Sequence, residues 1–232
     1  MISSFYTASS GAIWLQKKLD VTANNVANVS TTGYKSGNAS FSDLVYTNVY
    51  PQGVNDKLKI GNGVKLEKTD TAFTDGPINQ TDRPLDFALR SDGFFAVQTA
   101  GGIRYTRDGS FMLSAENGTS YLTNANGDYV LNSQGQRIAV SDGQQNLDIG
   151  VFNFPNKDGL VKEGSNYFSV TPNAGAVSLV TNPNLKQGAL ESSAVNLADE
   201  MTNIITSQRS FQFNTKVVQI SDEIMQTINS LR

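Results

Sequence analysis

If this protein were an enzyme, its aspartates would be the best candidates for catalytic residues. Two carboxyl groups flanking a sugar linkage can cleave it, one as an acid and the other as a base or nucleophile. Six aspartates could supply such a pair: Asp70, Asp75, Asp82, Asp86, Asp92 and Asp108. Most of them lie beside or near Gly or Pro, where a solvated turn position is the more common role.

Histidine and cysteine are both absent from the 232 residues. Their absence removes the commonest general base, the commonest metal ligand, the thiolate nucleophile and every disulfide. The segment Asn124–Asp128 resembles a calcium loop but lacks the full spacing and the distal Glu, so it predicts a hairpin turn. Gly61–Gly63 lacks the Lys-Ser/Thr pair of a phosphate loop. We therefore expect no catalytic residue, no cofactor and no metal.

Charge and hydropathy exclude two further classes of function. The formal net charge is −3, with an isoelectric point near 5.0, which argues against a nucleic-acid partner. No segment approaches the ~20 apolar residues of a membrane span. Lys17 and Lys18 follow the mildly apolar N-terminal stretch instead of preceding it, so we expect no cleaved signal peptide.

The elements that would position functional side chains begin with a helix over residues 1–29. Apolar and small residues recur at intervals of three and four, as in a heptad repeat: Ile2, Phe5, Ser9, Ala12, Gln16, Leu19, Ala23 and Val26. Other apolar residues lie on further sides of this helix, which predicts packing against several neighbours.

A second helix is predicted from about residue 195 to 232. Asn196 is a suitable N-cap, and Asp199 and Glu200 fall in the first turn, where the helix dipole favours negative charge. Its apolar residues form two runs with a change of register between them: Leu197, Met201 and Ile204, then Phe213, Val217, Ile220, Ile224 and Leu231.

Short alternating segments between the helices predict antiparallel strands. Asp92-Gly93 and Asn126-Gly127 are hairpin signals, and Asp108-Gly109 is a further turn. Residues 36–80 contain apolar pieces without a clear period, which predicts an extended connector. The fold class is thus α+β, with N- and C-terminal helices pairing as a coiled coil around an inserted antiparallel β domain.

This organisation predicts three regions. Residues 1–35 and 190–232 form a discontinuous helical assembly domain, residues 36–80 the connector, and residues 81–189 the β domain. Helices at both ends that each lack a full set of partners indicate a polymerising subunit with marginal order as a monomer. We expect the assembly interface to contain Leu15, Leu19, Asn25, Val26, Asn28, Leu197, Met201, Ile204, Phe211, Val217, Ile220, Ile224 and Leu231.

Three parts of the sequence resemble the flagellar rod and hook proteins of bacteria. Gly11 with Val21–Thr31, followed by Thr31–Ser36 and Phe41–Tyr46, is similar to the N-terminal signature of that family. Arg83–Thr99 with Tyr105–Phe111 resembles the central domain of rod proteins, and Leu197–Val218 resembles their C-terminal helix. Ile78–Asp86 is closer to the proximal rod protein and the segment from Ser207 to Asn214 to the distal one, so the position along the rod stays open.

The resemblance implies a structural subunit of the flagellar basal body in the cell envelope. Such a subunit is exported unfolded by the flagellar type III apparatus without a cleaved leader. It stacks helically with copies of itself and with neighbouring rod or hook subunits to form a shaft that transmits torque. Asn25 and Asn28 would then fix the register between subunits, or they are local caps at the helix end. A hook-type axial protein, another fibre or adhesin subunit and a carboxylate glycoside hydrolase are the alternatives.

Overall fold

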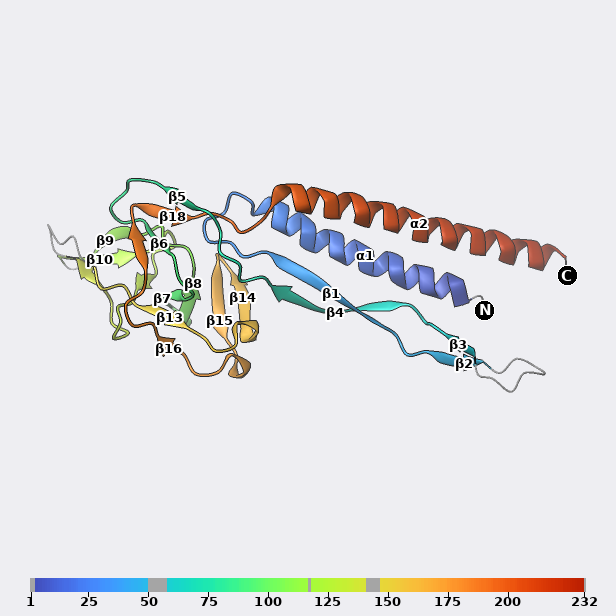
Figure 1. Ribbon diagram of the computed structural model, residues 1–232, viewed down its shortest axis with the longest axis horizontal. Helices are drawn as coiled ribbons and strands as arrows, with labels where there is room; N and C mark the ends of the chain where they lie inside the picture. The colour runs from blue at the N-terminus through green and yellow to red at the C-terminus, as the bar shows by residue number, and fades with distance from the viewer. Residues whose placement is uncertain (1–2, 50–57, 117, 141–146, 232) are drawn as a thin grey trace. The chain divides into compact units, whose positions relative to one another are not determined.

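The computed structural model describes residues 3–49, 58–116, 118–140 and 147–231. A long helix lies near each end of the chain, and antiparallel strands fill the sequence between them (Figure 1), which confirms the α+β class. The chain forms two compact units. The helical unit comprises Met1–Ala27, Gly37–Ala72 and Asn196–Arg232, and the β unit comprises Asn28–Ser36 and Phe73–Val195.

The two helices of the helical unit lie side by side: α1, Ser3–Ala27, and α2, Leu197–Ser230. Asn196 caps α2 as predicted, because its side chain accepts a hydrogen bond from the backbone N–H of Ala198 at 3.1 Å. Within the described residues of this unit, Ala8 is the only buried apolar side chain. No helix in the described part of the chain is long and apolar enough to cross a membrane.

A long β-hairpin completes the helical unit. Strand β1, Gly37–Asp43, pairs antiparallel with β4, Val64–Thr71, with a register shift between Ser40 and Phe41. Further along the hairpin, β2, Thr47–Val49, pairs with β3, Leu58–Ile60. The sequence predicts an extended connector with a few strand-like contacts over residues 36–80, and the pairing of β1 with β4 is more extensive than those few contacts. Strand β1 is rich in Gly, Asn and Ser, so its stability comes from backbone ladder bonds that leave no period in the sequence.

Among its described residues, the β unit contains one ten-stranded sheet and two small two-stranded sheets. The large sheet has a central path in the order β12-β10-β11-β7-β8-β15-β14, with β9, β13 and β16 paired off it. Its strands are β7 Phe94–Thr99, β8 Gly102–Thr106, β9 Met112–Glu116, β10 Thr119–Thr123, β11 Tyr129–Val130, β12 Ala139–Val140, β13 Val151–Asn153, β14 Leu160–Gly164, β15 Tyr167–Val170 and β16 Ser178–Leu179. The small sheets pair β5 Ile78–Gln80 with β18 Ala189–Glu191, and β6 Phe87–Leu89 with β17 Leu185–Gln187. Two 3₁₀ turns, Lys157–Gly159 and Pro172–Ala174, flank β14 and β15.

Strand β7 is the centre of the core because both of its faces are buried. Phe95 and Val97 belong to one hydrophobic cluster, and Phe94 and Ala96 belong to a second. Successive side chains of a strand point to opposite faces, so one short strand supports both clusters.

Of the two predicted hairpin turns, one is wrong in its pairing and one is confirmed. Asp92-Gly93 does not close a hairpin, because β6 pairs with β17, about a hundred residues away, instead of with β7. Asp108-Gly109 does not join paired strands either, since β9 pairs with β10. Asn126-Gly127 is a hairpin turn between β10 and β11, closed by a bond from the Gly127 N–H to the Asn124 carbonyl at 3.0 Å. Alternation identifies a strand, but it does not identify the strand's partner.

Candidate assembly interface

The contact between α1 and α2 is made by small and polar side chains. The Oγ atoms of Ser4 and Ser221 lie 3.5 Å apart. A Cβ added to Gly11 would lie 3.0 Å from Nδ2 of Asn214, so the helices approach closely there. Glu200, Asn214 and Ser221 follow a seven-residue spacing that also includes the buried Ser207. The two helices therefore meet along a polar stripe.

Asn25 anchors this stripe at the C-terminal end of α1. Its Nδ2 donates to Oε1 of Glu200 at 2.8 Å and to the Gly37 carbonyl at 2.9 Å, while its Oδ1 accepts from the Gly37 N–H at 2.8 Å. Only 2% of Asn25 is exposed. Its amide joins both helices and the hairpin within one chain, and a role of Asn25 in the register between copies stays a prediction.

Asn28 lies just beyond the end of α1 and has a local role. Its Oδ1 accepts a hydrogen bond from the Thr31 hydroxyl at 3.1 Å, and its carbonyl accepts from the Thr31 N–H at 3.1 Å. This geometry fits the local-cap alternative instead of the register hypothesis.

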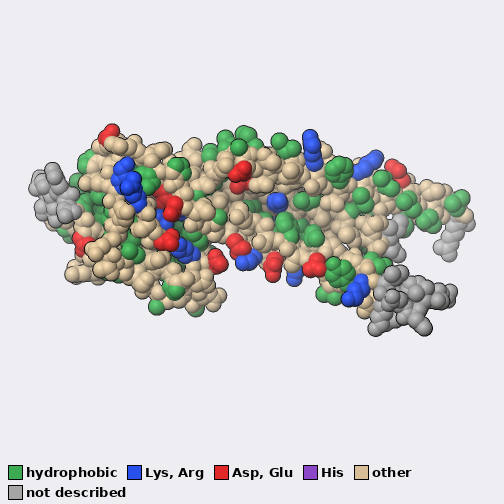
Figure 2. Space-filling view, in the orientation of Figure 1, with side chains coloured by type: hydrophobic (Ala, Val, Ile, Leu, Met, Phe, Trp, Pro, Cys, Tyr) green, Lys and Arg blue, Asp and Glu red, His purple; other side chains and the backbone are tan. Residues whose placement is uncertain are grey.

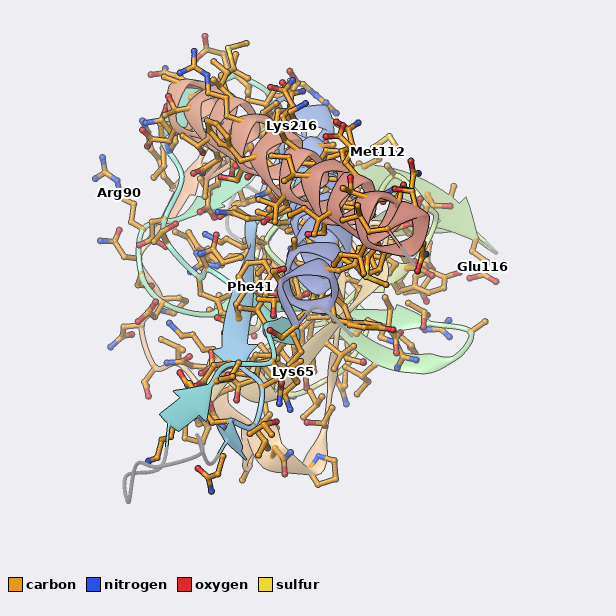
Figure 3. All side chains as sticks on the ribbon, turned by 90° about the vertical axis from the view of Figure 1, so that its right-hand side faces the viewer. Phe41, Lys65, Arg90, Met112, Glu116 and Lys216 are labelled. Carbon is orange, nitrogen blue, oxygen red and sulfur yellow. The ribbon has the colours of Figure 1, made fainter. Side chains whose placement is uncertain are left out.

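Most of the large apolar side chains of α2 lie outside the polar stripe and are exposed. Seven of the predicted interface residues are at least one-third exposed: Leu197, Met201, Phe211, Val217, Ile220, Ile224 and Leu231. Four others are half-buried: Leu15, Leu19, Val26 and Ile204. Figure 2 shows apolar side chains interspersed over the surface of the helices, and Figure 3 places Lys216 on α2 and Phe41 on the hairpin. Exposed large apolar side chains spread along a helix of this length are typical of a surface that packs against another chain.

A charge cluster in the β unit is formed by the buried Lys35, Arg107 and Glu191 and by Asp75, whose side chain is 56% exposed. Nζ of Lys35 lies 2.6 Å from Oε1 of Glu191 and donates to the Thr74 carbonyl at 2.6 Å. Arg107 lies 3.4 Å from Oε2 of Glu191 and 3.2 Å from Asp75. The cluster links the end of the N-terminal signature to strand β18, which precedes α2.

Burial dominates the electrostatics of this cluster. The side chains of Lys35 and Glu191 are each 1% exposed. Burial lowers the pKa of Lys35 from its usual 10.5, and the Glu191 carboxylate opposes that shift by favouring the charged ammonium. The Gly76 N–H also donates to Oε1 of Glu191 at 2.9 Å, so the carboxylate is well coordinated.

Gly33 allows the signature segment to approach this cluster. Its φ is +66°, and a Cβ there would lie 2.7 Å from the backbone carbonyl carbon of Arg107. Its N–H donates to the Glu191 carbonyl at 2.8 Å. Sequence reasoning missed the whole cluster, because nothing in the spacing of Lys35, Arg107 and Glu191 indicates that they meet.

The six candidate catalytic aspartates have separate structural contacts. Four of them form ion pairs: Asp70 with Lys68, Asp75 with Arg107, Asp86 with Arg83 and Asp92 with Lys157. Asp82 accepts a bond from Gln80, and Asp108 accepts two from Ser110. Among the described residues no group of three or more acidic side chains is arranged to hold a metal ion.

A helical unit with exposed apolar side chains, joined in sequence to a β unit with its own core, is typical of a structural subunit that associates with other chains. Three family models match the chain: the flagella basal body rod protein over residues 5–35, the flagellar hook protein FlgE/F/G D1 domain over 88–162, and the flagellar basal body rod FlgEFG protein C-terminal over 186–231.

Relatives of known identity match along their full length. The chain is 36% identical to the flagellar basal-body rod protein FlgG of Bacillus subtilis and 35% identical to that of Buchnera aphidicola from Acyrthosiphon pisum, covering 100% of both chains in each comparison. It is also 32% identical, over 100% of both chains, to the flagellar hook-basal body complex protein FlhP of Bacillus subtilis. The chain belongs to the flagellar basal-body rod protein family. It is a structural protein of the flagellar basal body that assembles with flagellar components, and not an enzyme.

Proposed function

We propose that this chain stacks helically with copies of itself and with neighbouring rod or hook subunits into a shaft that transmits torque through the cell envelope. One observation carries the proposal: the apolar residues of α2 are exposed although α1 already lies against this helix. Burying a large apolar side chain fully contributes ~1.5–3 kcal/mol, so neighbouring chains have much to gain by covering this face.

In the proposed assembly, α1 and α2 pair as a coiled coil and the apolar residues contact other copies. The interface contains the outward residues of α2 together with Leu15, Leu19, Val26 and Ile204. Residues 1–35 and 190–232 would act as the assembly domain and residues 81–189 as an outer β domain. The seven-residue spacing of the polar stripe supports the coiled-coil pairing.

We further propose that the chain reaches this position unfolded, through the flagellar type III export apparatus. The scarcity of buried apolar side chains in the helical unit supports this step. A unit whose only buried apolar side chain among the described residues is Ala8 has little hydrophobic stabilisation to lose on unfolding. Order would then be gained on assembly, when neighbours cover the exposed residues.

The test is a charge placed on the apolar face of α2. Ile220, 44% exposed, is changed to Asp, with Gln219→Asp as a matched control that adds the same charge to the adjacent, exposed polar position. We expect Ile220→Asp to leave the β unit folded, measured by circular dichroism, and to abolish incorporation into basal bodies and motility.

Gln219→Asp is expected to retain motility. Normal motility with Ile220→Asp would refute the assigned interface. Loss of motility with a chain that is absent from the cell envelope fraction but folded in the cytoplasm would place the defect in export instead. Truncation distinguishes the proposal from a trimeric fibre subunit, because deletion of either terminal helix should abolish assembly of a rod subunit.

A further inference from the structure

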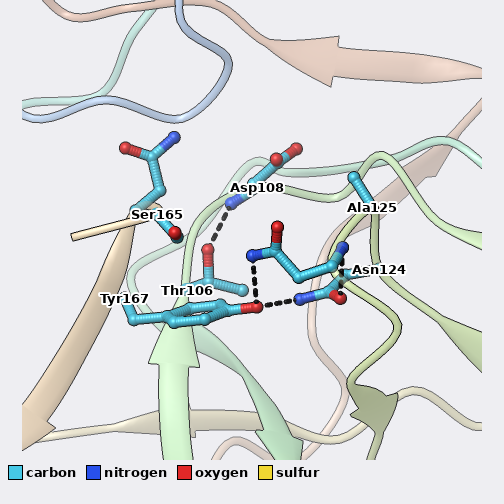
Figure 4. Close-up of a pocket in the computed structure, with 8 residues that line it drawn as sticks. Thr106, Asp108, Asn124, Ala125, Ser165 and Tyr167 are labelled. Carbon is cyan, nitrogen blue, oxygen red and sulfur yellow. Dashed lines mark hydrogen bonds between the residues drawn. The ribbon is translucent and has the colours of Figure 1, made fainter. Parts of the chain in front are cut away.

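A polar recess of about 220 Å³ lies on the β unit where three turns converge (Figure 4). Thr106 and Asp108 line it from the end of β8, Asn124–Asn126 from the β10–β11 turn, and Ser165–Tyr167 from the β14–β15 turn. Ser165 and Asn166 both have positive φ, 49° and 59°, so this last turn is a tight one. All of these residues belong to one compact unit.

The Tyr167 hydroxyl fixes the amide groups at the base of the recess. It donates to Asp128 and accepts from Nδ2 of both Asn124 and Asn126. Because the amide nitrogen of Asn126 is engaged, Oδ1 is the polar atom of that side chain left for a ligand. In the same way, Nδ2 of Asn166 donates to the Thr32 carbonyl, so Oδ1 of Asn166 is the polar atom of that side chain left for a ligand.

The carboxylate of Asp108 adds negative charge to these acceptors. Its Oδ1 accepts from the N–H and the hydroxyl of Ser110 at 3.0 and 2.8 Å, so Oδ2 is left without a hydrogen bond from the described residues. Burial raises the pKa of Asp108 and the neighbouring Asp86 carboxylate raises it further, while the bonds from Ser110 lower it. No Lys or Arg in the described ranges forms an ion pair with Asp108.

The nearby cations of the β unit are engaged elsewhere. Arg104 pairs with Glu163, Arg107 with Glu191 and Asp75, and Lys157 with Asp92. The residues that line the recess therefore carry a carboxylate, the amide oxygens of Asn126 and Asn166, and the hydroxyls of Thr106 and Ser165. An anion would be repelled by Asp108, and an apolar group would leave these acceptors unsatisfied.

We propose that this recess binds a positively charged nitrogen group, a guanidinium or an ammonium. Such a group carries only donors, which match the acceptors present, and its charge compensates the Asp108 carboxylate. The group comes either from a free small cation or from an Arg or Lys side chain of another chain. The binding site does not depend on the assembly proposed above.

The experiment is a titration of the ¹⁵N-labelled full-length chain, followed by amide chemical shifts. The probes are methylguanidinium, methylammonium and methylurea, the last having the shape of methylguanidinium without its charge. We expect at least one charged probe to shift the amides of the three turns in a saturable way, and methylurea to leave them unchanged. Asp108→Asn keeps an Oδ1 for Ser110 but replaces the second oxygen with a donor, and it should weaken binding by about tenfold or more.

Asp158→Asn is the matched control, because Asp158 is an exposed carboxylate of the same unit that does not line the recess. If it weakens binding as much as Asp108→Asn, or if methylurea binds as well as the cations, the proposal is wrong. Absence of saturable shifts for both cations also overturns it. Ser165→Lys offers a second test that does not remove the carboxylate, since its ammonium should occupy the recess and block the probes.

The source of the cationic group is distinguished by sedimentation. The comparison is made at low salt, once probe binding is established for the unaltered chain. If Asp108→Asn self-associates less than the unaltered chain, the cationic group is a side chain of a second copy. Unchanged self-association excludes a second copy of this chain as the source. Both results support the site, and neither requires motility or a basal body.

Discussion

Glu191→Gln tests whether the buried charge cluster stabilises the β unit. The substitution keeps the volume of the side chain and removes the charge that faces Lys35 and Arg107. Removing one partner of a buried ion pair costs ~3–5 kcal/mol, because the other charge is left uncompensated. Nζ of Lys35 retains the Thr74 carbonyl and lies 3.8 Å from Asp75, so we expect the lower end of this range, about 3 kcal/mol.

The assay is urea unfolding of the full chain, followed by circular dichroism of the β unit. With a slope of about 2 kcal/mol per molar urea, the midpoint should fall by ~1.5 M. Trp14 is the only tryptophan of the chain and lies in α1, so its fluorescence reports on the helical unit separately. The deficit should shrink as the pH rises toward 10.5, because a neutral Lys35 no longer requires a counter-charge.

Asp92→Asn is the control, because it removes one partner of an ion pair of the same length that is largely exposed to solvent. Asp92 and Lys157 are also 2.6 Å apart, but their side chains are 58% and 24% exposed. The lost hydrogen bond and charge should cost less than ~1 kcal/mol in that setting. Equal losses for Glu191→Gln and Asp92→Asn would refute the argument from burial. So would additivity of Lys35→Met and Glu191→Gln, since removing both charges should cost less than the sum of the single changes.

Three further outcomes follow from the geometry of single positions. Asn25→Ala should lower the free energy of unfolding by ~1–3 kcal/mol, read from Trp14 fluorescence in urea, whereas the exposed Gln16→Ala should change it by less than ~0.5 kcal/mol. Burial raises the pKa of Asp108, so the carboxyl group loses its proton at a lower pH in the unfolded chain than in the folded one. The free energy of unfolding should therefore fall as the pH rises from 3.8 through the pKa of the folded state. Asp108→Asn should remove this fall and be more stable than the unaltered chain at pH 7. Gly33→Ala should cost clearly more in thermal unfolding than Gly127→Ala, which has φ of +86° but open space around it; equal costs would mean that only φ matters.

Elements with local signals could be predicted from the sequence. The N-cap at Asn196 and the turn at Asn126-Gly127 depend on side chains within a few residues, and both were identified. The pairing of β1 with β4 has no such signal, because the two strands contain few apolar residues.

Long-range pairings had no comparable signal. Strand β6 meets β17 across about a hundred residues, and Lys35 meets Glu191 across 156 positions. The position of a charge in the sequence does not show whether it is buried. The hydrogen bonds of Asn25 to Gly37 and Glu200 likewise have no signal in the sequence.

The distribution of polar and apolar residues on α2 explains why a rod subunit of this kind would favour a lattice over a dimer. The exposed large apolar side chains between Leu197 and Leu231 are 36–84% accessible to solvent. Completing the burial of each one therefore adds on the order of 1 kcal/mol. One helix-to-helix contact covers only a few of them, while association costs ~4–15 kcal/mol in lost freedom of motion. A single neighbour therefore gains too little to hold the chain. When several neighbours contact the chain at once, each contact adds buried apolar area, whereas most of the lost freedom of motion is incurred only once. The exposed apolar residues of α2 therefore favour cooperative growth over isolated pairs.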